Sequence, residues 1–179
     1  MAAWISLIAT ALGALIAFSG STLSEGLKSR REQARSQLET QRQITVDFIL
    51  VVDKVHGLLR QVATQSTDIS ELRTAAREAV GSSGIYGTRE QMLISVPPKV
   101  AVAAEAVFHA LIAIRDAVES GAELGSSPYK KAYNDWAGAV WALRQMAREA
   151  FSVAPLNLDK IHEIEADRLE KRNSGSNSP

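Results

Sequence analysis

The first twenty-four residues, MAAWISLIATALGALIAFSGSTLS, carry no charged side chain, and a group of basic residues follows them closely. Residues 2–20 would span about 28 Å as a helix, which is close to the roughly 30 Å hydrocarbon thickness of a bilayer. We expect residues 1–24 to form a transmembrane anchor. Two alternatives stay open at this stage: a cleaved secretory signal, which normally starts with a positively charged region, and a buried soluble helix, which is usually shorter.

The charges that flank this apolar opening predict its orientation. Only the α-amino group precedes it, whereas basic residues follow it at Lys28, Arg30, Arg31 and Arg35. Basic residues are retained on the cytoplasmic side of a membrane. We therefore expect a single-pass protein of the cell membrane, with its N-terminus outside and the rest of the chain in the cytoplasm.

Small residues recur every four positions inside the predicted anchor, at Ala9, Gly13 and Ala17. Spacing of this kind lets two helix backbones approach closely in lipid. It favours membrane helix packing, either between two copies of the chain as a homodimer or with another membrane protein. The alternative is chance, because alanine is abundant throughout the sequence.

The composition favours helix and excludes several kinds of chemistry. Proline is absent before Pro97. The chain has 20 basic and 20 acidic residues, so no excess of charge points to nucleic acid as a partner. Cysteine is absent, which removes disulfides, thiolate metal sites and thiol nucleophiles. We predict an all-α fold in which an N-terminal transmembrane helix runs through a helical stalk into a four- or five-helix bundle.

One helix is expected to run from about Trp4 to about Ala63, because no proline interrupts this part and one seam of apolar positions continues through it. Residues 25–43 are polar and are interpreted as a helical juxtamembrane stalk. If two copies pair, their stalks would form a short two-stranded coiled coil. The seam positions of that coil would be Leu27, Ala34, Leu38 and Gln41.

Residues 44–156 are predicted to form the cytoplasmic bundle. Asp68 and Glu71 have the spacing of a capping box, so a helix is expected to begin there and to stop at GSSG, residues 81–84. The next stretch, residues 85–96, fits either a helix or a loop.

Two further helices of the bundle are predicted from proline and serine positions. Pro97 and Pro98 suit the first turn of a helix over residues 97–120, which is apolar almost all round and should therefore be central. Ser127 and Pro128 fit the cap and the first residue of the helix that follows.

The end of the chain has the pattern of one more helix. Residues 157–172 are predicted to form a C-terminal amphipathic helix, and residues 173–179 a disordered tail. The apolar edge of this predicted helix is narrow and consists of Leu158, Ile161, Ile164 and Leu169.

Aromatic residues gather in the segment YKKAYNDWAGAVWALRQM, residues 129–146. Tyr133 and Trp136 lie on the predicted core stripe. Trp141 lies off that stripe, on a side that it shares with Arg144 and Arg148. Since tryptophan and arginine are enriched at interface hot spots, these three are candidates for a partner surface. The alternative is a tryptophan at the edge of the core.

Each of the three histidines has a carboxylate one helical turn away. In di-iron bundles a Glu-x-x-His pair projects into the core from each of two helices. Here two of the three acids are aspartates, and ion pairing along exposed helix faces accounts for the spacing. We therefore predict no metal ligand and no cofactor at these pairs: Asp53 with His56, Glu105 with His109, and Asp159 with His162.

The sequence contains no catalytic motif. No serine lies in a Gly-x-Ser-x-Gly elbow, and no glycine-rich loop follows a strand pattern. No catalytic residue is predicted, and we expect that the protein is not an enzyme.

Three stretches carry a resemblance at the level of architecture: GALIAFSG in the apolar opening, KSRREQAR in the stalk and LIAIRDAV in the bundle. With them the chain resembles uncharacterised single-pass, membrane-anchored helical-bundle proteins of high-GC Gram-positive bacteria. The resemblance implies the same architecture and carries no activity.

An anchor, a stalk and a bundle without catalytic groups favour one class of function. We expect a membrane-anchored interaction module or scaffold that docks a protein partner at the cytoplasmic face of the membrane. The alternative is a sensor bundle that binds a small apolar ligand between its helices.

Overall fold

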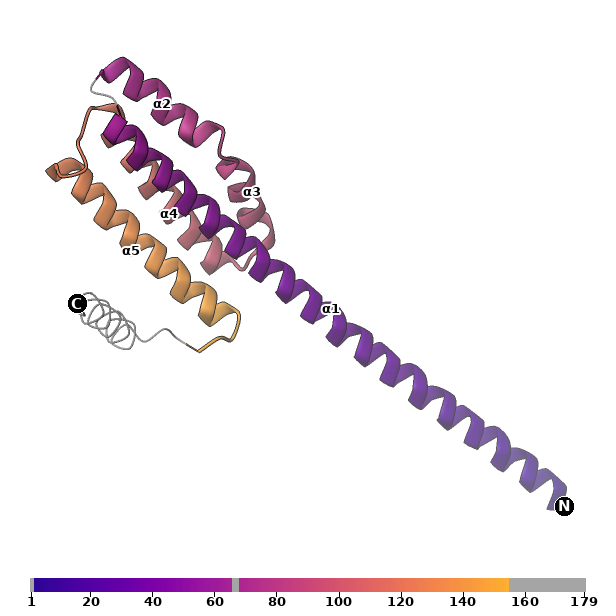
Figure 1. Ribbon diagram of the computed structural model, residues 1–179. Helices are drawn as coiled ribbons and strands as arrows, with labels where there is room; N and C mark the ends of the chain where they lie inside the picture. The colour runs from indigo at the N-terminus through magenta and orange to yellow at the C-terminus, as the bar shows by residue number, and fades with distance from the viewer. Residues whose placement is uncertain (1, 66–67, 155–179) are drawn as a thin grey trace, which may run out of the picture.

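The computed structural model describes the backbone of residues 2–65 and 68–154, and within these ranges it describes side chains from residue 28 onwards. All the regular structure in this part of the chain is helical. The helices form one bundle, from which the first helix extends far to one side (Figure 1). The predicted all-α bundle is confirmed. Its elements are α1 (Ala2–Gln65), α2 (Ile69–Gly81), α3 (Ile85–Ser95), α4 (Pro98–Glu119) and α5 (Ser127–Ala150).

Helix α1 is one uninterrupted helix of 64 residues, as predicted from about Trp4 to about Ala63. At about 1.5 Å per residue it is roughly 95 Å long. Only its C-terminal part packs in the bundle, and the N-terminal part projects away from it (Figure 1).

The bundle begins earlier on α1 than residue 44, the predicted boundary. Leu38 already packs against the core, and Gln41 Nε2 donates a hydrogen bond to the carbonyl of Ser95 at 2.8 Å. Side chains are consistently exposed only over residues 28–37 of the described stalk. Both side chains contact the bundle of their own chain, and the predicted two-stranded coil stays a prediction.

Beyond this point the seam of α1 is buried. A polar residue of the seam, Thr45, is tolerated there because its hydroxyl donates to the carbonyl of Gln41 at 2.8 Å. The apolar residues that follow are at most 1% exposed: Phe48, Val52, Val55 and Leu59.

Helix α2 begins and ends as predicted. The Asp68 carboxylate caps it by accepting from the backbone N–H groups of Ser70 at 2.7 Å and Glu71 at 3.2 Å. These bonds, with one from the Ser70 hydroxyl, hold the pKa of Asp68 below its usual range. After Gly81 the chain turns at Gly84, whose φ of +83° suits glycine.

The open alternative for residues 85–96 is decided in favour of helix. Residues Ile85–Ser95 form α3, which buries Ile85 and Met92 completely. A hydrogen bond from the Ile85 N–H to the Ser83 hydroxyl, at 3.1 Å, starts this helix.

Helix α4 is the central helix, as its all-round apolar sequence predicts, because it packs against each of the other four. It begins at Pro98, with Pro97 as its N-cap. Its buried residues are Val100, Ala104, Val107, Phe108, Leu111, Ile114 and Val118.

Helix α5 differs from its prediction in two details. Ser126 is its N-cap, so Ser127 is the first helical residue and not the cap. Trp136 is buried, as expected, but Tyr133 is 41% exposed and lies at the edge of the core. The backbone of this helix packs mainly against α4, and its contacts with α1 are made through side chains.

Within the part of the chain that the structure describes, no helix is long and apolar enough to cross a membrane. The side chains of residues 1–27 lie outside the description, and so does everything from residue 155 onwards. The anchor over residues 1–24, the helix over residues 157–172 and the tail that follows it therefore stay predictions. The same holds for the proposed membrane-packing residues Ala9, Gly13 and Ala17.

Replacement of Leu111 by alanine should lower the free energy of unfolding by about 2–5 kcal/mol, because it leaves a cavity in the centre of the bundle. Leu111 is 0% exposed, whereas Val102 on the same helix is 71% exposed. The matched control Val102→Ala should change the free energy by less than about 0.5 kcal/mol. Urea unfolding followed by circular dichroism measures both, and equal effects would contradict the assignment of α4 as the central helix.

Candidate functional site

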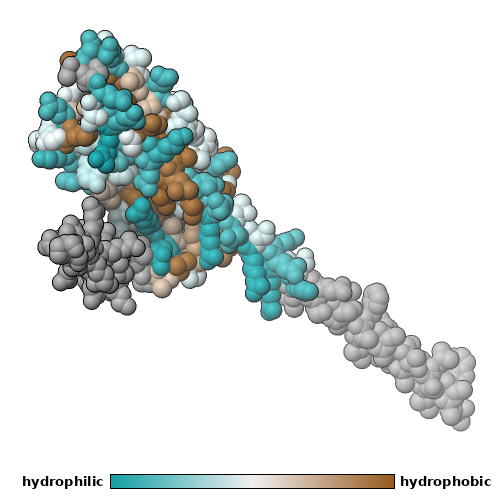
Figure 2. Space-filling view, in the orientation of Figure 1, coloured by the Kyte–Doolittle hydropathy of each residue, from teal (hydrophilic) through white to brown (hydrophobic). Residues whose placement is uncertain are grey.

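A shallow groove lies between α1 and the C-terminal end of α5. Its volume is about 340 Å³ and its surface is almost entirely apolar. Figure 2 shows hydrophobic surface on this face of the bundle, bordered by hydrophilic residues. We call it the arginine groove; its lining residues are Arg42, Thr45, Val46, Ile49, Arg144, Ala147, Arg148, Phe151 and Val153.

The groove lies where the backbone of α5 is close to α4 and farther from α1. The two walls therefore stand apart at this end of the bundle, and the small side chain of Ala147 leaves the space open. Apolar side chains of the groove remain in contact with water: Val46 is 48% exposed and Val153 is 38% exposed. Leu50, one turn along α1 from Val46, is 61% exposed. An apolar surface of this kind favours a partner that covers it.

Arg42 stands on the α1 side of the groove. Its Nη2 donates a hydrogen bond to the carbonyl of Phe151 at 2.8 Å, which ties the end of α5 to α1. Its Nη1 lies 3.7 Å from Glu39 Oε2, and its guanidinium lies 6.0 Å from the centroid of the Phe151 ring.

Arg144 and Arg148 stand on the α5 side. Arg144 Nη2 lies 3.9 Å from Asp53 Oδ2, and the two side chains are 44% and 46% exposed. Arg148 Nε donates to the carbonyl of Ala154 at 2.6 Å. No carboxylate belongs to the described lining, so the groove itself carries three arginines and no acidic residue.

The chain leaves α5 at the rim of the same groove. Ser152 has a φ of +55°, and the N–H of Val153 donates to the carbonyl of Arg148 at 2.8 Å. This six-to-one hydrogen bond after a left-handed residue is the Schellman motif, which ends a helix. Val153, which follows this turn, lines the groove.

The three predicted partner-surface residues are only partly brought together. Arg144 and Arg148 line the arginine groove, whereas Trp141 does not, and it is half-buried. The opposite wall, with Arg42 and Val46, was not predicted, because it comes from a segment about a hundred positions away in the sequence. One signal was available: Val46 is an apolar residue that lies off the seam of α1.

The histidine–carboxylate pairs do not form a metal site in the described part of the chain, where no group of three or more potential ligands occurs. Glu105 binds Arg89 through two hydrogen bonds of 2.5 and 2.8 Å, which hold the pKa of Glu105 below its usual range. His109 lies 3.7 Å from Glu105 and is 73% exposed. This pair fits the predicted surface ion pairing, and the pair of Asp159 with His162 lies outside the described residues.

His56 contradicts the prediction of an exposed ion pair, because it is 8% exposed and lies among aromatic rings. Its ring centroid is 4.2 Å from that of Trp136 and 5.5 Å from that of Tyr133. Its Nε2 lies 3.5 Å from the Tyr129 hydroxyl. Burial lowers the pKa of His56, the positive charge of Arg60 lowers it further, and the charge of Asp53 opposes them.

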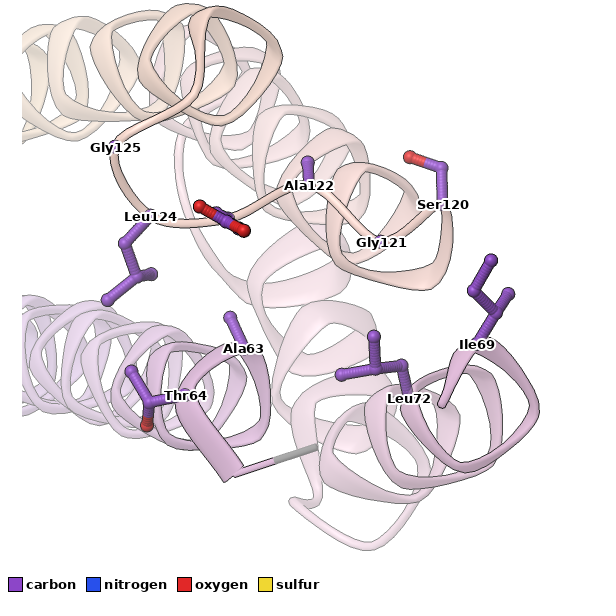
Figure 3. Close-up of a pocket in the computed structure, with 10 residues that line it drawn as sticks. Ala63, Thr64, Ile69, Leu72, Ser120, Gly121, Ala122, Leu124 and Gly125 are labelled. Carbon is purple, nitrogen blue, oxygen red and sulfur yellow. The ribbon is translucent and has the colours of Figure 1, made fainter. Parts of the chain in front are cut away.

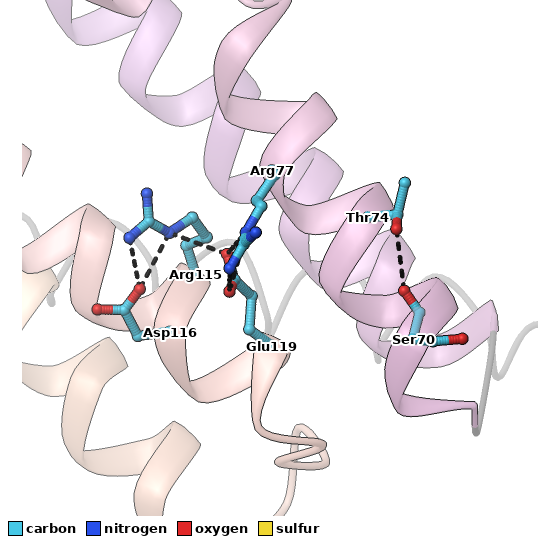
Figure 4. A network of polar contacts seen from close by, with 6 residues as sticks. All are labelled: Ser70, Thr74, Arg77, Arg115, Asp116 and Glu119. Atoms are coloured by element: carbon cyan, nitrogen blue, oxygen red, sulfur yellow. Dashed lines mark hydrogen bonds and ion pairs between the residues drawn. The ribbon is translucent and has the colours of Figure 1, made fainter.

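A second polar cluster joins α2 to α4 (Figure 4). Arg77 Nη2 and Arg115 Nε lie 3.1 and 3.3 Å from the same Glu119 carboxylate, which is 13% exposed. Arg115 Nη2 also lies 2.6 Å from Asp116. All the charges of this cluster are used in pairing, which gives it a structural role at the junction of two helices.

A larger cavity, of about 570 Å³, lies at the opposite end of the bundle from the stalk (Figure 3). It is open to solvent, and its lining combines apolar side chains such as Ile69, Leu72 and Leu124 with Thr64, Ser120 and Glu123. The ligand-sensor alternative expects a closed apolar cavity between helices, which this is not. That alternative stays a prediction.

Comparisons with protein-family models, with curated protein sequences and with solved structures found no match.

Acidification should destabilise the bundle through His56. Since the pKa of His56 is below 6.5 in the folded protein, the unfolded chain takes up the proton first as the pH falls through 6.5. The free energy of unfolding should then fall by up to about 1.4 kcal/mol per pH unit. Unfolding by urea between pH 7.5 and 5 measures this slope.

The variant His56→Phe should lose this component of the pH dependence, because phenylalanine fills the aromatic cluster without titrating. The control His109→Gln, at an exposed position, should keep it. An unchanged slope in His56→Phe would contradict the role of His56.

Proposed function

We propose that the chain is a membrane-anchored interaction module that docks a protein partner in the arginine groove at the cytoplasmic face of the membrane. The observation that carries the proposal is an apolar groove with three arginines and no acidic residue in its lining. The occupant we propose is an amphipathic helix of the partner, whose apolar edge is flanked by carboxylates.

Two physical features of the groove support an occupant of this kind. Helices commonly bind by laying an apolar edge into a groove between other helices, where the burial of apolar surface supplies affinity. Arg42, Arg144 and Arg148 would then meet the carboxylates, which selects for acidic partners and speeds their encounter. Arginine is also among the residues that contribute most to interface energies.

The proposed membrane attachment is supported by the uncharged opening, residues 1–24, and by the basic residues that follow it. Helix α1 continues from that segment without a break as far as the bundle. From Ser24 to Leu38 the helix would hold the bundle about 21 Å from the bilayer. A homodimer held by Ala9, Gly13 and Ala17 is compatible with this arrangement, provided that the helices separate before Leu38.

A reporter fused to the C-terminus tests the topology. We expect cytoplasmic activity of the reporter, sedimentation of the protein with membranes and resistance to extraction at alkaline pH, because residues 1–24 would stay in the bilayer. The variant Leu12→Arg with Leu15→Arg should release the protein, since charges are costly at the bilayer centre. A mature chain that begins after residue 20 would end the anchor proposal.

Photo-cross-linking in cells tests the docking site. A benzophenone amino acid placed at Val46 should give one heavier adduct, whose cross-linked peptide is an apolar segment that carries acidic residues. The same group at Ile94, which is 82% exposed on α3, is the matched control and should not give this adduct. The double variant Arg144→Glu with Arg148→Glu should remove the Val46 adduct by reversing the charge of the groove.

Loss of the adduct in that double variant separates docking from chance capture. An adduct that survives the charge reversal, equal adducts from Val46 and Ile94, or no adduct at all would each count against the proposed site. The double variant Arg144→Lys with Arg148→Lys, which keeps the charge, should retain most of the adduct.

A further inference from the structure

We propose that the C-terminal segment of the same chain, residues 156–172, occupies the arginine groove when no partner is bound. This inference rests on the proposed function, because it assigns to that docking site a competitor built into the protein. Three observations carry it: the place where the described chain ends, the apolar surface left open there, and the charge of the groove.

The chain arrives at the groove and is fixed there. Arg42 holds the carbonyl of Phe151 at 2.8 Å, and Arg148 holds the carbonyl of Ala154 at 2.6 Å. The same two arginines line the groove, together with Val153. The segment that follows Ala154 therefore begins next to the residues that line the groove.

The chain leaves the axis of α5 at the groove. The left-handed residue Ser152 and the Schellman hydrogen bond of Val153 end α5 at this point. Pro155 then prevents a direct continuation of α5. A segment that folds back here would run against the direction of α5 and alongside α1, whose wall lies across the groove.

The segment is long enough to cover the groove. As a helix, residues 156–169 would be about 21 Å long, whereas the α1 wall of the groove, from Arg42 to Ile49, is about 11 Å long. The apolar edge of Leu158, Ile161, Ile164 and Leu169 would cover Val46, Ile49 and Val153, of which Val46 is 48% and Val153 38% exposed. Because the segment is tethered beside the groove, its docking is intramolecular and loses less freedom than the association of a separate chain.

The segment carries five acidic and four basic residues, and its charge is complementary to the groove on one side only. The segment carries acidic residues every four positions at Asp159, Glu163 and Asp167, which places them on one side of a helix. The groove offers Arg144 and Arg148 on the wall of α5. Arg144 has its only described carboxylate contact with Asp53 at 3.9 Å, which is too long for a hydrogen bond and leaves its donors available to a closer acid.

A partner helix would then have to displace residues 156–172 from the groove. The apparent affinity of the groove for a partner would then be proportional to the fraction of chains in which the groove is free. Removal of the apolar edge of residues 156–172 should therefore raise partner binding, although these side chains would not contact the partner.

Paired cysteines test the proposal, and the chain is suited to this because it contains no cysteine of its own. In the full-length protein in isolated membranes, Val46→Cys with Ile161→Cys should be joined within one chain by a short bismaleimide. The matched control is Ile94→Cys with Ile161→Cys. Ile94 lies on α3 beside Gln41 of α1, and α3 lies on the other side of α1 from α5 (Figure 1). We expect about tenfold more cross-linking within one chain in the first pair than in the control.

Charge reversal gives a second readout in the same variant. Addition of Arg144→Glu and Arg148→Glu should lower the yield about fivefold. Further addition of Asp159→Arg and Glu163→Arg should restore it, which a loss of folding would not allow.

Equal yields in the two cysteine pairs would overturn the proposal. So would cross-links that form only between chains when the single variants Val46→Cys and Ile161→Cys are mixed, because they would assign the groove to a second copy. These outcomes need no partner, so they are independent of the docking test. If the intramolecular cross-link forms and Ile161→Asp with Ile164→Asp gives no increase in the partner adduct from Val46, the segment occupies the groove and the proposed function fails instead.

Discussion

The burial of one seam of α1 among the other helices is the constraint on which the rest of the structure depends. Phe48, Val52, Val55 and Leu59 are at most 1% exposed, and they face the central helix α4 and the pair formed by α2 and α3. Most of the stability of a protein helix comes from tertiary packing and not from its own hydrogen bonds. Burial of this seam therefore determines where α1 joins the bundle. The position of Leu38, with its contacts to the core, marks that point.

The arginine groove follows from the way α5 packs between its neighbours α4 and α1. Because α4 is apolar almost all round, it packs closely along α5, whereas α1 meets α5 mainly through side chains. These contacts join His56 to Trp136, Asp53 to Arg144, and Arg42 to the carbonyl of Phe151. The arginine groove opens beside the last two of these contacts, at the C-terminal end of α5.

The helices could be predicted from local signals, because each has one near its ends. Asp68 caps α2, Gly84 ends the turn after it, and Pro98 starts α4. The residues of α3 have no clear amphipathic period, so the choice between helix and loop needed the contacts of Ile85 and Met92 with the core.

Side-chain surroundings were harder to predict, because they depend on neighbours far away in the sequence. The spacing of Asp53 and His56 fits an exposed ion pair, yet Tyr129 and Trp136 of α5 cover the histidine. For the candidate site, Arg144 and Arg148 were identified from their own helix. Arg42 was not, since what brings it to them is the three-dimensional arrangement of α1 and α5 around α4.

Helix α1 forms both the projecting part of the molecule and one wall of the groove. The number of residues between these two parts therefore determines the position and orientation of the groove relative to the N-terminus. Each residue added to or removed from the exposed stretch 28–37 would shift the groove along the helix axis by about 1.5 Å and rotate it by about 100° relative to the N-terminus. The chain has no hinge proline over this range with which to absorb such a change. The length of one helix thus sets both the height of the groove and the direction in which it faces, and a change of seven residues, close to two turns, would shift the height by about 10 Å and rotate the groove by only about 20°.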